Sequence, residues 1–271
     1  MGSKIWLSGM LVLSLLLTLF PAQASDLEKE KRWEAQIVDA LIVGEAVKLK
    51  AGDTEFLALF AEHNTEKAMG AAIVLHGIGA HPAWPEVVEP LRTNLPDHGW
   101  ATLSLQMPIL PNEAETEQYA PLFKNEVRPR IQAGVDFLKQ KGIQNIVIVA
   151  HSLGASMASH YLSQKRDPAI SAFVGIGMSR NMADPSMDTA ASLRNINKLP
   201  VLDLYGSRDL SQVLDSAKAR ADAATRAGNK QFSQVKIEGA DHFFSNMDAV
   251  LVKRVRGWMA KHAAGTELPK K

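Results

Sequence analysis

The chain has 271 residues, of which 30 are Lys or Arg and 29 are Asp or Glu, so its formal net charge is +1. This near balance does not indicate a polyanionic partner such as nucleic acid or an anionic surface. Cysteine is absent, which excludes disulfide bonds, thiol catalysis and cysteine-ligated zinc. The length and a hydrophobic content of 46% suit one sizeable domain with its own core.

The N-terminal segment has the pattern of a cleaved export signal. Lys4 precedes a mostly apolar run over residues 5–20, and Ala22-Gln23-Ala24 has the A-x-A form of a cleavage site. The run is short for a membrane span, which needs about 20 residues, so an uncleaved anchor is the less favoured alternative. We therefore expect removal of residues 1–24, a single domain over 25–271, and a periplasmic or secreted protein without stable membrane insertion.

From residue 45 onward, predicted strands alternate with predicted helices. Apolar runs favour strands at residues 45–49, 55–61, 71–75, 101–105, 145–150, 169–176, 200–205 and 232–237. Helices are favoured from Pro85, which stands at a first helical position, and over residues 127–138, 155–162, 210–227 and 251–258. The charged stretch 25–32, ahead of these elements, is expected to be a solvated segment.

This alternation predicts the architecture. Nearly continuous apolar strands, separated by amphipathic helices, predict an α/β fold with a mostly parallel sheet of about eight strands and helices on both faces. The insertions at 106–120 and 178–197 are too short for a large independent cap, although the second has room for a helical flap. Functional residues of such sheets collect at the carboxyl ends of the strands, so the chemistry is expected directly after them.

The most informative segment is Ala150-His151-Ser152-Leu153-Gly154, at the junction of an apolar strand and a helix. A serine with small residues two positions before and after it is typical of a nucleophile elbow, a tight turn that lifts the hydroxyl above the sheet. The strained backbone and the helix N-terminus favour developing negative charge there. Ala150 stands where the usual pattern has glycine, and this turn tolerates its single methyl group in some families. The alternative role for Ser152 is a helix N-cap.

A serine nucleophile needs a base, and the base needs an orienting acid. Asp209 follows the strand at 200–205 and His242 follows the strand at 232–237, so the predicted catalytic residues are Ser152, Asp209 and His242. Other aspartates are weighed against Asp209: Asp203 and Asp215 as alternative acids, and Asp241 as a turn residue. Asp209 is favoured because the acid of this arrangement belongs in the loop after a strand.

A second glycine-containing turn follows the strand at 71–75. Its sequence, His76-Gly77-Ile78-Gly79, allows backbone N–H groups to turn inward. We expect the N–H groups of Ile78 and Leu153 to form an oxyanion hole. His76 and His151 are expected to be buried supports rather than bases. The small residues that support the two turns are Gly77, Gly79, Ala150 and Gly154.

These segments carry a resemblance to known proteins. The loop at 76–79 and the elbow at 150–154 resemble those of the α/β-hydrolase superfamily, especially small bacterial lipases and carboxylesterases with an alanine-type elbow. Residues 76–85 and Gly99-Trp100-Ala101-Thr102-Leu103-Ser104 are similar to an exported bacterial family of this superfamily whose function is unassigned. The first resemblance implies the fold, the triad and ester chemistry. The second implies export but no particular substrate.

The sequence therefore predicts an exported serine hydrolase that cleaves carboxylic esters with short or medium acyl groups through an acyl-enzyme. Thioester, lactone and amide substrates share this chemistry and stay open. The alternative is a noncatalytic binding or scaffolding protein of the cell envelope with the same fold. Metal-binding and nucleotide-binding motifs are absent, so the expected partner is a small acyl substrate, without metal or cofactor. The sequence leaves the oligomeric state open.

Overall fold

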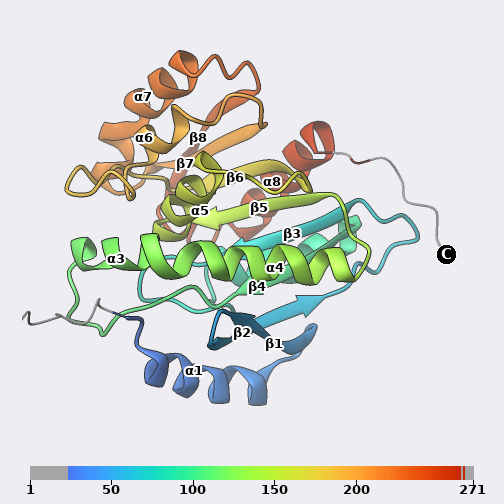
Figure 1. Ribbon diagram of the computed structural model, residues 1–271. Helices are drawn as coiled ribbons and strands as arrows, with labels where there is room; N and C mark the ends of the chain where they lie inside the picture. Colours follow the sequence, from blue (N-terminus) through green and yellow to red (C-terminus); the bar gives the residue numbers. More distant parts are fainter. Residues whose placement is uncertain (1–23, 264, 266–271) are drawn as a thin grey trace, which may run out of the picture.

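The computed structural model describes residues 24–263 and 265, which form an eight-stranded sheet with helices on both faces (Figure 1). The strands are β1 (Glu45–Ala51), β2 (Thr54–Ala61), β3 (Gly70–Leu75), β4 (Trp100–Leu105), β5 (Ile146–His151), β6 (Ile170–Ile176), β7 (Val201–Arg208) and β8 (Phe232–Asp241). Their spatial order is β1-β2-β4-β3-β5-β6-β7-β8. The pairs β1–β2 and β2–β4 are antiparallel and the others are parallel, which confirms the predicted sheet.

Helices connect and cover these strands. They are α1 (Leu27–Ala40), α2 (Val88–Asn94), α3 (Ala120–Leu122), α4 (Arg128–Gln140), α5 (Leu153–Ser163), α6 (Thr189–Leu193), α7 (Ser211–Arg226) and α8 (Asp248–His262). A π-helical turn over Phe123–Val127 precedes α4. Within residues 24–263, no helix combines the length and apolar character that a membrane crossing requires.

Two layers of apolar side chains, one on each face of the sheet, hold these helices in place. On the face nearest the viewer in Figure 1, α4 and α5 contribute Ile131 and Met157 to the core. On the opposite face, α2 and α8 contribute Leu91 and Val255 to a second buried cluster. Strand β5 is buried along its whole length because both of its faces are covered, and this explains its continuous apolar sequence.

The long insertions pack against the body of the protein instead of forming a separate cap. The segment 106–120 buries Leu110 and Tyr119, and helix α6 of the segment 178–197 buries Leu193 in the same core. The predicted small or absent cap is therefore correct.

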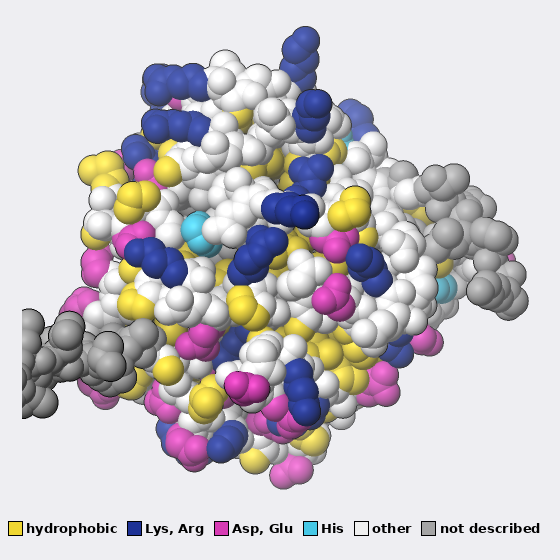
Figure 2. Space-filling model, viewed as in Figure 1, with side chains coloured by type: hydrophobic (Ala, Val, Ile, Leu, Met, Phe, Trp, Pro, Cys, Tyr) yellow, Lys and Arg dark blue, Asp and Glu magenta, His cyan; other side chains and the backbone are white. Residues whose placement is uncertain are grey.

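Figure 2 shows Lys and Arg side chains interspersed with Asp and Glu side chains over one face of the molecule.

The prediction of a solvated segment over residues 25–32 is wrong, because this segment begins helix α1 and buries two charged side chains. Lys29 Nζ donates to Leu110 O at 3.0 Å, and Glu30 Oε2 accepts a hydrogen bond from Arg130 at 2.8 Å. These partners lie 81 and 100 residues further along the chain. These hydrogen bonds offset the cost of burying the two charged side chains. Their partners are too distant in the sequence for a local pattern to reveal them.

The prediction that Pro85 opens a helix is also wrong, because helix α2 begins at Val88. Val87 has φ = +61°, a backbone conformation that interrupts a helix, and Pro85 therefore belongs to the preceding turn. Gly99, with φ = +85°, terminates the 3₁₀ turn Leu95–His98 that follows α2.

Candidate active site

Ser152 lies at the sharp turn between the end of β5 and the start of α5. Its backbone has φ = +53° and ψ = −124°, and such positive-φ geometry costs a non-glycine residue roughly 1–3 kcal/mol. The Ser152 N–H donates to Ile176 O at 2.8 Å and holds the turn. Ser152 stands at the N-cap position of α5, but its side chain makes no capping hydrogen bond to the helix. The hydroxyl is left for other partners.

The two small positions of the elbow differ in what they allow. A Cβ on Gly154 would lie 2.2 Å from His76 O, so position 154 requires glycine. Ala150 is fully buried, and its methyl group packs within the core. The neighbouring loop also approaches closely, since a Cβ on Gly77 would lie 3.1 Å from Ser152 Cβ. The alanine at position 150 is therefore compatible with the turn.

The structure brings the three predicted catalytic side chains into one hydrogen-bonded chain. His242 Nε2 lies 2.9 Å from Ser152 Oγ, and His242 Nδ1 lies 2.6 Å from Asp209 Oδ1. Ser152 directly follows β5, Asp209 directly follows β7 and His242 directly follows β8. The three residues therefore meet at the carboxyl edge of the sheet. Asp209 and His242 are buried, whereas Ser152 is partly exposed. A ligand can reach the hydroxyl while its partners stay shielded from water.

Asp209 is held as a carboxylate by three donors. Besides His242, the N–H of Gly206 donates to Oδ2 at 3.2 Å and the N–H of Leu210 donates to Oδ1 at 2.8 Å. Burial by itself raises the pKa of Asp209, but the hydrogen bond and charge of His242 and these two N–H groups together hold that pKa below its usual range. Asp209 is therefore negatively charged at neutral pH and can stabilise an imidazolium.

The competing aspartates have different partners. Asp203 is fully buried inside β7 and accepts a hydrogen bond from Arg220 Nε at 2.8 Å. Asp215 is exposed on α7. Asp241 accepts hydrogen bonds from two backbone N–H groups of the turn that follows it, as expected of a turn residue. Among these carboxylates, Asp209 is the one that contacts His242.

Gly177, which the sequence analysis did not single out, leaves the space that the His242 ring occupies. It has φ = +60°, and a Cβ there would lie 2.8 Å from His242 Cε1 and 2.9 Å from Nδ1. On another side, His151 Nε2 donates to the His242 backbone O at 2.9 Å. Burial lowers the pKa of His151 to about 4, so it is a neutral support. Gly177 directly follows β6, and its position after a strand end is the sequence signal that could have identified it.

The N–H groups of Ile78 and Leu153 lie beside the nucleophile. Leu153 follows Ser152 and opens α5, and the first N–H groups of a helix have no intrahelical acceptor. Ile78 follows Gly77, whose Cα packs against Ser152. Within residues 24–263, neither N–H donates a hydrogen bond to another protein group. Both N–H groups are therefore left without a protein acceptor among the described residues, and their role as an oxyanion hole stays a prediction.

The long insertion contacts the loop that contains Ile78 through His76. His76 Nδ1 donates to Gly77 O at 2.8 Å, while its Nε2 accepts a hydrogen bond from Met107 N at 2.9 Å. Burial lowers the pKa of His76 to about 3, so the ring is neutral. Tyr119, a residue the sequence analysis did not identify, accepts a hydrogen bond at Oη from the Leu110 N–H at 3.0 Å and fixes the inserted segment itself. The segment 106–120 thus stabilises the shape of this loop.

Apolar side chains flank the hydroxyl-bearing face. Ile78 is 43% exposed and Phe243 is 44% exposed, and the Phe243 ring lies edge-on to the His242 ring at 5.2 Å. Leu210, next to Asp209, is 42% exposed.

In the part of the chain that the structure describes, no three His, Asp or Glu side chains are grouped to hold a metal ion.

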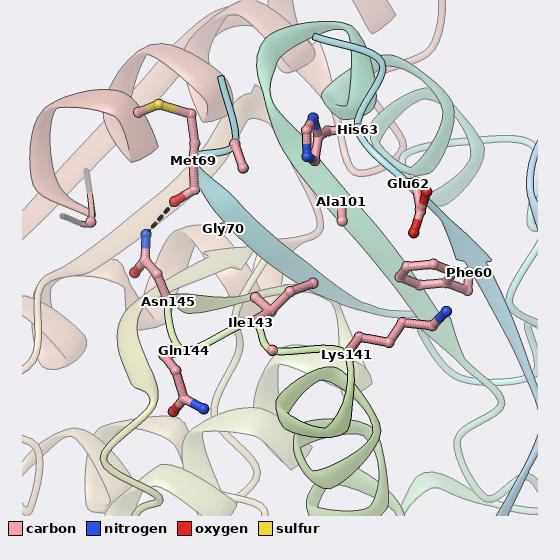
Figure 3. Close-up of a pocket in the computed structure, with 13 residues that line it drawn as sticks. Phe60, Glu62, His63, Met69, Gly70, Ala101, Lys141, Ile143, Gln144 and Asn145 are labelled. Atoms are coloured by element: carbon pink, nitrogen blue, oxygen red, sulfur yellow. Dashed lines mark hydrogen bonds between the residues drawn. The ribbon is translucent and has the colours of Figure 1, made fainter. Parts of the chain in front are cut away.

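A cavity of about 520 Å³ lies at the opposite edge of the sheet (Figure 3). Its lining includes Phe60, Met69 and Ile143, and Asn145 donates to Met69 O at 2.6 Å at its rim. Asn145 precedes β5 and Ser152 follows it, so the cavity is separated from Ser152 by the length of a six-residue strand, about 20 Å. The candidate active site is therefore identified by its side-chain geometry and not by this cavity.

Comparisons with known proteins agree with this architecture. A family described as "Protein of unknown function (DUF3530)" matches residues 18–121 and 111–261. Est1E from Butyrivibrio proteoclasticus is 16% identical with a TM-score of 0.63, covering 81% of this chain and 99% of that chain. A dienelactone hydrolase from Anabaena variabilis is 20% identical with a TM-score of 0.61, covering 80% of this chain and 97% of that chain.

A serine hydrolase from Xanthomonas campestris, described as lacking a lid, is 13% identical with a TM-score of 0.61, covering 83% of this chain and 97% of that chain. No curated protein matches the sequence. The structural likenesses establish the α/β-hydrolase fold.

Proposed function

The chain belongs to the DUF3530 family of proteins of unknown function, and we propose that it is a serine hydrolase that cleaves carboxylic esters. The observation that carries this proposal is the unbroken hydrogen-bonded chain from Asp209 through His242 to Ser152. The positive φ of Ser152 supports it, because strained backbone is typical of functional turns.

The first half of the reaction transfers the acyl group to the enzyme. Ser152 Oγ attacks the acyl carbon while His242 Nε2 accepts the hydroxyl proton, and Asp209 stabilises the resulting imidazolium. The N–H groups of Ile78 and Leu153 donate to the oxyanion of the tetrahedral intermediate. When the intermediate collapses, His242 returns the proton to the leaving alcohol and an ester of Ser152 remains.

The second half releases the acid. A water molecule gives a proton to His242 Nε2 and attacks the acyl carbon, and the same two N–H groups bind the second oxyanion. Collapse breaks the bond to Ser152 Oγ, which takes the proton back from His242. Each enzymatic group ends in its starting protonation state.

Short or medium acyl esters are the substrates we propose. The exposed apolar side chains of Ile78 and Phe243 support this class, because they offer apolar contacts beside the hydroxyl. One similar structure carries the description "Ferulic Acid bound to Est1E", and two others are described as dienelactone hydrolases or putative ones. Thioesters, lactones and amides remain alternative substrates of the same residues.

Export to the periplasm or the extracellular space is part of the proposal. Its support is the sequence pattern of Lys4, the apolar run and Ala22-Gln23-Ala24. Apart from Ala24, this predicted signal lies outside the described residues.

A fluorophosphonate probe tests the proposed nucleophile. We expect the folded protein to become labelled and the Ser152→Ala variant to remain unlabelled. Ser156→Ala is the matched control, since Ser156 is a buried serine of α5 four residues away, and it should keep the labelling. A folded wild type that resists the probe would favour the noncatalytic binding protein instead.

A panel of p-nitrophenyl esters from acetate to palmitate tests the substrate class. We expect the highest kcat/KM for short and medium acyl groups, and a decrease on Phe243→Ala. Ile42→Ala is the control, because Ile42 is 94% exposed and lies outside the site. A preference confined to long acyl chains would contradict the proposed substrate.

A further inference from the structure

Ser25 is the first buried residue of the described chain, and charged side chains from far along the sequence hold it. Ala24 is exposed, whereas Ser25 is 9% exposed. The Ser25 N–H donates to Glu126 Oε1 at 2.9 Å, and its Oγ donates to Glu126 Oε2 at 2.7 Å. Arg130 Nη2 donates to Ser25 Oγ at 3.0 Å and to Glu126 Oε2 at 3.2 Å. A carboxylate therefore faces the backbone nitrogen of Ser25.

This cluster holds more negative than positive charge. Arg130 also donates to Glu30 Oε2 at 2.8 Å, so one buried guanidinium serves two carboxylates. Glu30 is buried, and its Oε1 has no hydrogen-bond partner among the described residues. Burial raises the pKa of Glu30, Arg130 opposes the rise, and the charge of Glu126 adds to it. The neighbouring Lys29 donates to a backbone carbonyl instead. Two carboxyl groups of the cluster therefore share one guanidinium.

We propose that Ser25 is the first residue of the processed protein and that Glu126 binds its α-ammonium group, which adds a second positive charge beside the two carboxyl groups. A signal-type endopeptidase hydrolyses the Ala24–Ser25 peptide bond with one water molecule. The hydroxyl of water goes to the Ala24 carbonyl carbon and a proton goes to the Ser25 nitrogen, which is an ammonium at neutral pH. Because this nitrogen already lies at hydrogen-bond distance from Glu126, the charge is gained without moving the chain.

The bound ammonium is connected to the oxyanion loop. Arg130 Nη1 donates to Gln106 O at 3.0 Å, and Gln106 Nε2 donates to His76 Nε2 at 3.2 Å. His76 in turn donates to Gly77 O. The guanidinium that contacts Glu126 therefore also contacts the segment that supports the loop beside Ser152. The inference depends on the export processing proposed above and not on the hydrolase chemistry.

The pH dependence of this interaction follows from its charges. The groups that face or adjoin the ammonium are Glu126 before α4, Arg130 on α4, and Asp26, Lys29 and Glu30 at the start of α1. An unfolded α-amino group has a pKa of about 7.7–8.0, and contact with a carboxylate raises it. The stabilisation is therefore complete below about pH 7.7 and is lost as the pH rises through the higher pKa of the folded state.

Urea unfolding of two chains tests the proposal. One begins at Ser25 and the other at Gln23, and both are released from a removable fusion partner so that they differ in the charge at the Ser25 nitrogen. At pH 6.5 we expect the folding equilibrium constant of the Ser25 chain to be about tenfold larger, which corresponds to a pKa shift of one unit. At pH 10 this difference should close.

Matched variants assign the effect to Glu126. Glu126→Gln should abolish the difference between the two chains at pH 6.5, whereas Glu28→Gln, at an exposed glutamate of α1, should preserve it. Equal stabilities at pH 6.5, a difference that persists at pH 10, or one that is unaltered in Glu126→Gln would overturn the proposal.

Mass spectrometry of the full-length chain exported by a bacterial host gives a readout that needs no variant. An N-terminus at Ser25 supports the proposal, and any other N-terminal residue overturns it. None of these measurements uses catalytic activity, so failure of the proposed hydrolase function would leave their outcome unchanged.

Discussion

Replacing Gly177 with alanine tests whether the position of the His242 ring controls the reaction. A Cβ at position 177 would lie 2.8 Å from His242 Cε1, whereas ordinary van der Waals contacts begin at 3.4 Å. Relief of this contact requires a displacement of at least about 0.6 Å, the difference between these distances. A ring shift of this size disturbs hydrogen bonds of 2.9 Å to Ser152 and 2.6 Å to Asp209, because both already lie within the narrow range of good geometry.

The expected loss follows from this geometry. Misplacing a catalytic group by about 1 Å costs roughly 10²-fold in rate, so we expect Gly177→Ala to lower kcat/KM by roughly 30- to 100-fold. The positive φ of Gly177 adds a loss of stability of roughly 1–2 kcal/mol, because alanine is strained in this conformation. Hydrolysis of p-nitrophenyl butyrate measures the first effect, and urea unfolding measures the second.

Gly228→Ala separates these two effects. Gly228 has φ = +70°, and a Cβ there would have no heavy atom within 4 Å. This variant should lose a similar stability while keeping its kcat/KM. If Gly177→Ala retains more than half of the kcat/KM of Gly228→Ala, the argument that Gly177 makes room for the His242 ring is refuted.

Three further predictions concern the carboxylates and the elbow. Asp209→Asn should lower kcat by about 10⁴-fold and leave the fold largely unchanged, because Asp209 orients His242. Asp203→Asn should mainly lower the free energy of unfolding, by about 3–5 kcal/mol, because it leaves the buried Arg220 without its charged partner. Kinetics and urea unfolding of both variants distinguish these outcomes. Because folding lowers the pKa of Asp209, its contribution to stability is present above its unfolded pKa of about 3.9 and is lost as the pH falls through the lower folded pKa. Acid unfolding of Asp209→Asn should lack this component, and an unchanged profile would contradict it. Gly154→Ala should prevent soluble expression, since its Cβ would lie 2.2 Å from a carbonyl oxygen, whereas Ala150→Gly should express and label normally; equal expression of the two would contradict the elbow geometry.

The sequence was sufficient for features that depend on neighbouring residues in the chain. Continuous apolar runs identify buried parallel strands, because both faces of such strands are covered. The elbow around Ser152 is local too, since a tight strand-to-helix turn restricts the residues two positions away. The order of Ser152, Asp209 and His242, each after its own strand, placed them at one sheet edge before any distance was known.

Tertiary structure alone decided the features that depend on distant partners. The sequence predicts a solvated segment over residues 25–32, but Lys29 and Glu30 are buried because they are hydrogen-bonded to groups 81 and 100 residues away. Val87 adopts a positive φ that no helical pattern reveals, so Pro85 does not begin α2. Gly177 matters because the His242 ring occupies the space beside it.

The choice of acid shows the same division. Sequence order left Asp203, Asp209 and Asp215 as candidates, and it favoured Asp209 by its position after a strand. The structure shows Asp203 paired with Arg220 and Asp209 paired with His242. Backbone patterns determine where a strand ends, but the partner of a carboxylate depends on side chains that only the folded chain brings within hydrogen-bond distance.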